Sequence, residues 1–413
     1  MTEPFHSFCI VADDLSGAAD CAAAFAPVAG PVPVFLGEVR ESTDSLAMDT
    51  DSRTMDTTQA VAVTARAFEQ VVRGGLAGKL VYKKIDTTLR GHVGAELHPA
   101  LDAAPQFAAA VIAPAFPEQG RTLQGGQLRV QGRPAENLGH PGDLIGMLHV
   151  AGLDAARLGP RQEPPELARR IAEAVQGGAR VIVADALDRS DLERLADALC
   201  SSEVPRLLVA GSAGLARSLA AHVQPRTPGP ASGEPQPAAG PVMIVVGSFS
   251  NASNAQVQEV RASGDAQVIR LRAAQWVEQQ HAALRQKTLV IARDHLRNHR
   301  DLLLGIEGEI EQPFSRSTVR AMARLMAPLL QYAGTCLLTG GDTARAMFNE
   351  LGVDRLDVSG EFEPGIPIGR AAGHAAAFVV KAGGFGDALV LQRIIHRFGV
   401  RADPPPARPP APT

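Results

Sequence analysis

The stretch "IVADDLSGAADCAAAF", residues 10–25, joins a short apolar run to an alanine-rich segment through two neighbouring carboxylates, Asp13 and Asp14. An apolar run of this length is typical of a buried strand. The residues after the carboxylates turn the chain into a helix, and Ser16 is a candidate N-cap. The stretch therefore predicts a strand–turn–helix unit with charged side chains at the carboxyl end of its strand.

The same alternation of apolar and helical segments continues along the chain. Strands are predicted at "PVPVFL", "KLVYKKI", "AAAVIA", "ARVIVA" and "RLLVA", and later at "PVMIVVG", "AQVIRL", "KTLVIA", "TCLLTG" and "HAAAFVVKAGG". Helices are predicted between them, for example at "TTQAVAVTARAFEQVVRG" and "STVRAMARLMAPLLQYAG". This pattern predicts an α/β fold of two α/β domains with largely parallel sheets and a ligand cleft between them.

Proline and glycine mark the expected domain boundaries. The stretch "QPRTPGPASGEPQPAAGP" predicts a flexible linker at 224–241, between domains at 1–223 and 242–401. The proline-rich residues 402–413 predict a disordered tail. A chain of 413 residues is too long for one ordinary core, which agrees with this division.

The composition excludes several classes of partner. With a formal net charge of -4 and no basic run interleaved with aromatics, the chain lacks the features of nucleic-acid binding. No apolar run is long enough to span a bilayer, and the N-terminus is not that of a signal peptide, so we expect a cytoplasmic protein without a membrane partner. The four cysteines show no CxxC spacing and predict neither a zinc site nor a disulfide framework.

Polar residues directly after strands are the first candidates for a site, because ligands of open α/β sheets bind beyond the carboxyl ends of the strands. A carboxylate at Asp13 or Asp14 could accept hydrogen bonds from substrate hydroxyls or take a proton from one. The alternative is that both residues only cap the helix in solvent. The motif alone leaves the two interpretations open.

A second charged cluster follows the strand predicted within "KLVYKKIDTTLRGHVGAEL", residues 79–97. The two-residue repeat of a strand places Lys84 and Asp86 on one face and Lys83 on the other. Together with Arg90, these groups suit a small, polyhydroxylated anion. Lysines protecting an edge strand would explain the cations alone, but not the "DTTLRG" that follows.

Two loops are weaker candidates. "DTDSRTM", residues 49–55, contains Arg53 after an apolar patch, although a solvated turn is the better interpretation of this motif by itself. "PAFPEQGRT", residues 114–122, is a rigid polar loop with Arg121 that could line a site or be a plain connection.

Three glycine-rich strand ends occur in the second part, in "IVVGSFSNAS", "TCLLTGGDTARAMFNEL" and "VVKAGGFGDAL". Glycines before a helix leave backbone N–H groups free to bind an anion, and the helix N-terminus adds partial positive charge. One such end is slightly better explained as a capped turn, but three together favour a nucleotide pocket. No GxGxxG follows a strand, which disfavours a dinucleotide site.

The chain resembles the four-carbon acid sugar kinases, which include threonate, erythronate and 3-oxo-tetronate kinases. The matching segments occur in family order over nearly the whole chain: "ADDLSGAAD", "DSR", "KKIDTTLRGHVGAEL", "PAFPEQGRT", "GSFS", "TGGDTA", "EPGIPIG" and "KAGGFG". The resemblance implies that 1–223 binds the acid sugar and 242–401 binds ATP. It implies ATP- and Mg²⁺-dependent phosphorylation of the terminal (4-) hydroxyl of a four-carbon sugar acid, with D-threonate or a close relative (D-erythronate or a 3-oxo-tetronate) as substrate.

The resemblance also implies roles for individual residues. The catalytic candidates are Asp13 and Asp86, and no metal ligand is assigned. The candidates for substrate binding are Asp13, Arg53, Lys83, Lys84, Ile85, Asp86 and Arg90. The candidates for nucleotide binding are Ser248, Ser250, Gly340, Gly341, Asp342, Thr343, Gly383 and Gly384.

Two other functions stay open as alternatives. One is a dinucleotide-dependent oxidoreductase or isomerase of sugar acids, which the missing GxGxxG disfavours. The other is a non-catalytic sugar-acid sensor, which would not need the phosphate-like loops of the second domain. A homodimer is one option for the assembly, which the sequence does not determine.

Overall fold

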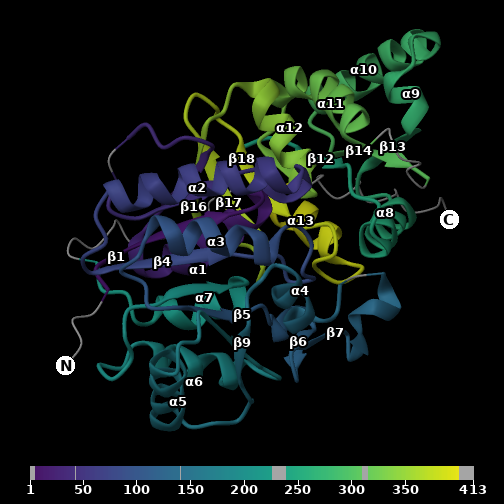
Figure 1. Cartoon of the computed structure of the whole chain (residues 1–413). Coiled ribbons are helices and arrows are strands. Elements are labelled where there is room, and N and C mark those ends of the chain that lie inside the picture. Colours follow the sequence, from purple (N-terminus) through teal and green to yellow (C-terminus); the bar gives the residue numbers. More distant parts are fainter. Residues whose placement is uncertain (1–4, 42, 140, 226–238, 309–314, 400–413) are drawn as a thin grey trace, which may run out of the picture.

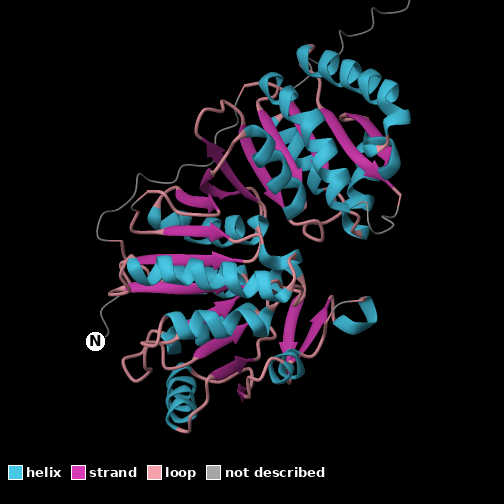
Figure 2. Cartoon of the chain, turned by 45° about the horizontal axis from the view of Figure 1, so that its top comes forward, coloured by secondary structure: helices cyan, strands magenta, loops and turns pink. Residues whose placement is uncertain are grey.

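The computed structural model describes residues 5–41, 43–139, 141–225, 239–308 and 315–399. Most of the predicted linker and the whole predicted tail, residues 402–413, lie outside these ranges. Helices and strands alternate along the described chain and helices cover the sheet, which confirms the α/β prediction (Figures 1 and 2).

A single 15-stranded sheet runs through both parts of the chain. In the first part the order is β2-β3-β1-β4-β11-β5-β10-β9, all parallel: β1 (Ser7–Ala12), β2 (Val32–Leu36), β3 (Leu46–Asp49), β4 (Lys79–Lys84), β5 (Ala110–Ala113), β9 (Ala155–Leu158), β10 (Val181–Ala184) and β11 (Leu208–Gly211). In the second part the order is β13-β14-β12-β15-β18, again parallel: β12 (Val242–Val246), β13 (Gln267–Arg272), β14 (Leu302–Glu307), β15 (Thr335–Thr339) and β18 (Ala377–Lys381). The two parts therefore share one sheet where two separate sheets were expected.

Helices and a small second sheet complete the described structure. The helices are α1 (Leu15–Ala29), α2 (Thr57–Arg73), α3 (Val93–Ala103), α4 (Leu144–Val150), α5 (Pro164–Gln176), α6 (Arg189–Leu199), α7 (Ala213–Ala220), α8 (Asn251–Ser263), α9 (Ala273–Val277), α10 (Ala282–Arg297), α11 (Ser315–Met326), α12 (Gly341–Leu351) and α13 (Val390–Phe398). The small sheet contains β6 (Arg121–Gln124), β7 (Gln127–Val130) and β8 (Arg133–Pro134).

Two antiparallel strands connect the parallel sets, and their twist brings the strand ends together. β16 (Arg355–Glu361) pairs with β2 on one side and with β17 (Pro367–Ala371) on the other, and β17 pairs with β18. These three antiparallel pairings reverse the strand direction between the two sets. Six steps separate β1 from β15, and a twist of roughly 20–25° a step accumulates to about 120–150°. The twist compensates the reversal, so the carboxyl ends of both sets meet.

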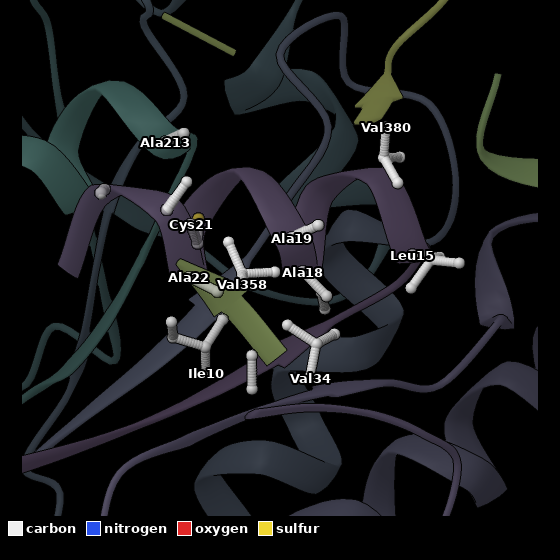
Figure 3. Close-up of a cluster of buried hydrophobic side chains, with 14 of the residues drawn as sticks. Ile10, Leu15, Ala18, Ala19, Cys21, Ala22, Val34, Ala213, Val358 and Val380 are labelled. Carbon is white, nitrogen blue, oxygen red and sulfur yellow. The ribbon is translucent and has the colours of Figure 1, made fainter. Parts of the chain in front are cut away.

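Helix α1 packs into the centre of the molecule, between the two parallel sets. Figure 3 shows Ala18, Ala19 and Ala22 of α1 close to Val358 of β16 and Val380 of β18, which both belong to the second part. Alanine is small enough to let a helix approach strands closely, and it loses no side-chain entropy on burial. The alanine-rich stretch therefore forms the joint between the two parts.

The strand predicted at "KTLVIA", residues 287–292, is wrong, because this segment lies within α10. The buried residues of α10 are Thr288, Ala292 and Leu296, spaced four apart as on one helix face, while Val290 and Ile291 are 45% and 38% exposed. The true strand is the next apolar run, β14.

Candidate active site

Asp14 begins helix α1 at the carboxyl end of β1. Its Oδ1 accepts a hydrogen bond from the Gly17 amide at 3.0 Å, and its Oδ2 accepts one from the Ser16 hydroxyl at 2.5 Å. Asp14 is thus the N-cap, and the prediction of Ser16 in that role is wrong. An aspartate in extended conformation before a helix makes this cap readily.

Arg53 pairs with carboxylates that follow two neighbouring strands, β1 and β4. Its Nε and Nη2 donate to both oxygens of Asp13 at 2.8 and 2.7 Å, and Nη2 also donates to Asp14 at 2.7 Å. Its Nη1 lies 3.5 Å from Oδ1 of Asp86. Burial by itself would raise the pKa of Asp13, but the Arg53 guanidinium outweighs it and the pKa is lowered. The "DSR" motif is therefore part of the charged cluster, although by itself it resembled a solvated turn.

Asp86 is the second strongly paired carboxylate. Arg90 donates to its two oxygens through Nε and Nη2, both at 2.8 Å, and the Thr88 hydroxyl donates to Oδ2 at 2.5 Å. Burial opposes ionisation, but Arg53 and Arg90 hold the pKa of Asp86 well below its usual range. Both catalytic candidates, Asp13 and Asp86, are therefore carboxylates of low basicity.

Lys84 is a buried cation beside these pairs. It is 3% exposed, and within the described ranges no carboxylate lies at ion-pair distance from its ammonium. A Cβ atom on Gly17 would lie 2.6 Å from the Lys84 Nζ and 2.7 Å from the Asp14 Oδ1. Glycine at position 17 thus leaves room for both charged groups, which a Cβ atom would crowd.

The structure does not bring Lys83 and Ile85 into the cluster. The Lys83 ammonium pairs with Glu96 at 2.7 Å, and both side chains are almost fully buried. Ile85 belongs to the hydrophobic cluster that includes Val11 and Leu97. Strand alternation explains this, since odd and even residues of β4 face opposite sides of the sheet.

A cavity of about 140 Å³ opens onto the charged cluster. Its polar lining includes Asp14, Asp20, Arg53, Lys84, Asp86, Thr87, Thr88, Arg90 and Arg121. Asp13 is not part of this lining, because it lies behind Arg53. The first part of the chain thus supplies both cations and carboxylates to a small cavity that Ser250, Gly384 and Phe385 of the second part complete.

A second cavity, of about 520 Å³, adjoins the first. All eight predicted nucleotide-binding residues line it: Ser248, Ser250, Gly340, Gly341, Asp342, Thr343, Gly383 and Gly384. They come from three separate loops, after β12, β15 and β18. The structure thereby brings together the three glycine-rich strand ends.

The two cavities share residues of both parts of the chain: Asp14, Ser16, Arg53, Arg90, Ser250, Ala382 and Gly384. A Cβ atom on Gly341, in the first turn of α12, would lie 2.6 Å from Oδ2 of Asp14. A carboxylate of the first part therefore lies against the glycine loop of the second. Reaction between a ligand in each cavity would take place beside Asp14.

Comparison with known proteins decides the family. A sugar-binding N-terminal domain matches residues 8–141 and 146–219, and a nucleotide-binding C-terminal domain matches residues 243–391. A D-threonate kinase of Cupriavidus necator is 35% identical over 93% of this chain and 96% of its own. The chain belongs to the four-carbon acid sugar kinase family.

Two further proteins are similar to this chain, one in sequence and one in structure. A 3-oxo-tetronate kinase of Haemophilus influenzae is 26% identical over 91% of this chain and 96% of its own. A crystal structure from Salmonella typhimurium LT2, described as that of a tRNA synthase, has a TM-score of 0.75 at 20% identity and covers 95% of this chain and 99% of its own. At that identity the likeness shows the fold alone. The chain is an ATP-using kinase of the four-carbon acid sugar class.

Sequence motifs did not identify Asp20 as a site residue of this kinase. It lies on α1 one turn after Gly17, lines the smaller cavity and is 4% exposed. Its side chain accepts a hydrogen bond from Nη2 of Arg217 at 3.4 Å, and burial raises its pKa to about 6. The helical spacing from Asp14 through Gly17 to Asp20 was the available signal, since residues three apart share a helix face.

Two kinds of feature are absent from the residues that the structure describes. None of their helices is long and apolar enough to cross a membrane. Nor do they contain a group of three or more His, Cys, Asp or Glu side chains placed to hold a metal ion.

Proposed function

We propose that this kinase transfers the terminal phosphoryl group of ATP to the 4-hydroxyl of a four-carbon sugar acid, with D-threonate as the first candidate. The observation that carries the proposal is the junction of the two cavities at Asp14, where a carboxylate meets the glycine loop before α12. The higher identity to the D-threonate kinase than to the 3-oxo-tetronate kinase favours D-threonate.

Lys84 and Arg121 are the cations best placed to bind the substrate carboxylate. Arg53 and Arg90 already pair with aspartates, whereas Arg121 has no carboxylate at ion-pair distance among the described side chains. Arg121 is 8% exposed, donates to the Gly384 carbonyl at 3.2 Å and lies over the ring of Phe385. A carboxylate bound by an ammonium and a guanidinium would compensate two buried positive charges.

Asp14 is our candidate for orienting the attacking hydroxyl. Phosphoryl transfer depends mainly on positioning and on charge stabilisation, with a carboxylate near the nucleophile. Asp14 lines both cavities, while Asp13 lies behind Arg53. Asp13 and Asp86 remain predictions as catalytic residues, and their lowered pKa values fit better with holding Arg53 and Arg90 in place.

Magnesium belongs to the same proposal, as the ion that accompanies ATP. In nucleotide sites Mg²⁺ usually takes one or two carboxylates together with phosphate oxygens and water. Asp14, Asp51 and Asp342 supply carboxylates to the larger cavity, so the residues present fit the ion. We propose that one or two of these carboxylates hold it together with the phosphates and water, since the three are not grouped closely enough to bind the ion by themselves.

The test mixes the purified protein with Mg-ATP and D-threonate, D-erythronate, L-threonate or 3-oxo-tetronates, and follows ADP release. We expect D-threonate to give the highest kcat/KM. Asp14→Asn should lower kcat at least a hundredfold, because one hydroxyl-orienting group is lost. The control Asp154→Asn removes an exposed carboxylate far from both cavities and should leave kcat unchanged. If no acid stimulates ADP release, the proposed function is wrong.

Two coarser expectations accompany the proposal. We propose that the enzyme acts in the cytoplasm, where ATP and small sugar acids are available. We retain the homodimer as a prediction, which light scattering of the purified protein tests. A monomeric mass at working concentration would contradict it.

A further inference from the structure

Lys381 lies at the end of β18, directly before the loop that lines the nucleotide cavity. It is completely buried. Its Nζ donates to the carbonyls of Ala382 at 3.1 Å, Gly383 at 3.4 Å and Phe385 at 3.1 Å. Across the described part of the chain, no carboxylate lies at ion-pair distance from this amine. The lysine therefore binds the back of the loop, and it is absent from the lining of both cavities.

Helix α8 supplies a second set of donors to the same carbonyls. The hydroxyls of Ser250 and Ser253 donate to the Gly383 carbonyl at 2.7 and 2.9 Å. The side-chain amide of Gln256 donates to the Phe385 carbonyl at 3.0 Å. Ser250 lines both cavities, but Lys381, Ser253 and Gln256 line neither, so these three donors hold the carbonyls from the protein side of the loop.

The orientation of the carbonyls fixes that of the amides. In a planar trans peptide the C=O and the following N–H point in opposite directions. With the carbonyls of Ala382 and Gly383 directed into the protein, the amides of Gly383 and Gly384 are directed outward. Both glycines line the larger cavity. Successive outward N–H groups form a concave site for an anion.

We propose that Lys381 is a positioning residue for nucleotide phosphate: its amine holds the loop from behind so that the Gly383 and Gly384 amides face the phosphates, and it does not touch them itself. The proposal rests on the proposed function, because it assumes that this cavity takes ATP. It goes beyond that function by assigning phosphate recognition here to backbone amides and by giving a lysine an indirect role.

The energetics of burial support a functional reason for this lysine. Burial alone lowers the pKa of Lys381 to about 7. An amine in an apolar environment without a counter-charge costs stability compared with an apolar side chain of similar length. If the lysine served stability only, methionine would be the better residue at this position. The need to hold three carbonyls explains why an amine is present.

The test measures ADP binding by calorimetry, without the sugar acid, for the wild type and for Lys381→Met. We expect the variant to bind ADP at least tenfold more weakly, while its Kd for D-threonate stays within twofold of the wild type. Its melting temperature without ligand should equal or exceed that of the wild type. In kinetics, the KM for ATP should rise and the KM for the acid should not.

Two serine variants keep the test decisive if Lys381→Met does not fold. Ser253→Ala removes one donor to the Gly383 carbonyl, and Ser263→Ala, at the far end of α8, is its matched control. We expect weaker ADP binding only for the first. Unchanged ADP affinity in Lys381→Met, or in Ser253→Ala where the methionine variant does not fold, would overturn the proposal. A wild type that binds no ADP would instead reject the proposed function.

Discussion

At the scale of single residues, the smaller cavity is defined by charges that the protein leaves without a full set of partners. Arg53, Asp13 and Asp86 are satisfied by one another. On the same cavity, Lys84 has no carboxylate at ion-pair distance among the described side chains, and Asp20 has the longer ion pair with Arg217, at 3.4 Å. A buried charge without a partner is costly, so a ligand with both anionic and hydroxyl groups is the natural complement.

Gly17→Ala tests the close packing at Asp14 and Lys84. The added methyl group would lie 2.6 Å from the Lys84 Nζ, so the ammonium must move. We expect the KM for the sugar acid to rise about tenfold or more. Stability should change little, because the preference of a helix for alanine over glycine, about 1 kcal/mol, is opposed by displacement of the Asp14 cap, whose Oδ1 would lie 2.7 Å from the added methyl group. The control Gly74→Ala has no heavy atom closer than 3.4 Å, and an equal KM in both variants would contradict the expectation.

Asp20→Asn tests whether an ionised carboxylate is needed in the smaller cavity. Because burial raises the pKa of Asp20 to about 6, we expect kcat/KM of the wild type for the acid to decline below about pH 6 and the variant to lose that decline.

The raised pKa of Asp20 in the folded protein also means that ionisation of this carboxyl opposes folding. The free energy of unfolding that is lost by ionising Asp20 is zero below about pH 3.8 and reaches its full value above about pH 6. The variant should therefore gain stability relative to the wild type at pH 8 but not at pH 4, measured by urea unfolding, while the exposed Asp102→Asn should show no such change.

At the scale of elements, helix α1 has two functions. Its first turn supplies Asp14 and Gly17 to the site, and its alanines pack against strands of both parts (Figure 3). The two functions require each other, because the carboxylate reaches the glycine loop only if the helix lies close to β16 and β18. A helix with larger side chains on this face would hold the two cavities apart.

Ala22→Leu tests this close approach. Ala22 is completely buried, and Figure 3 shows it among Ile10, Cys21 and Val358. Adding three carbons to a packed interior typically costs about 1–3 kcal/mol, so we expect the free energy of unfolding to fall by that amount in urea. Ala62→Leu, on an exposed position of α2, should change it by less than about 0.5 kcal/mol. Equal stability of the two variants would show that the interface is loosely packed.

At the scale of the whole molecule, the two parts are joined by backbone and by charge. The β16–β2 pairing makes the sheet continuous. Arg217 of α7 pairs with Glu361 of β16, and Arg345 of α12 pairs with the buried Asp49 at 2.6 Å. Because these contacts cross from one part to the other, neither part is expected to unfold alone.

Calorimetry of the full chain tests that coupling. We expect one unfolding transition whose calorimetric and van't Hoff enthalpies agree, as for a single cooperative unit. Saturating ADP or D-threonate should each move this same transition upward, because a ligand that binds only the folded state stabilises all of it. Two separate transitions, with ADP moving only one of them, would show that the parts are independent.

The sequence by itself determined the α/β class, the three glycine-rich strand ends and most of the charged cluster, because strand ends and their residue types are local features. It failed at residues 287–292, where a β-branched run lies in a helix, since packing on one helix face outweighs local preference. Asp20 had no strand end to mark it. Strand alternation already placed Lys83 on the face opposite Lys84 and Asp86. Only the tertiary structure decided that Asp14 lies at the junction of the two cavities and that Lys83 pairs with Glu96. The place of Asp14 depends on the β16–β2 pairing, which joins residues more than 300 positions apart in the sequence.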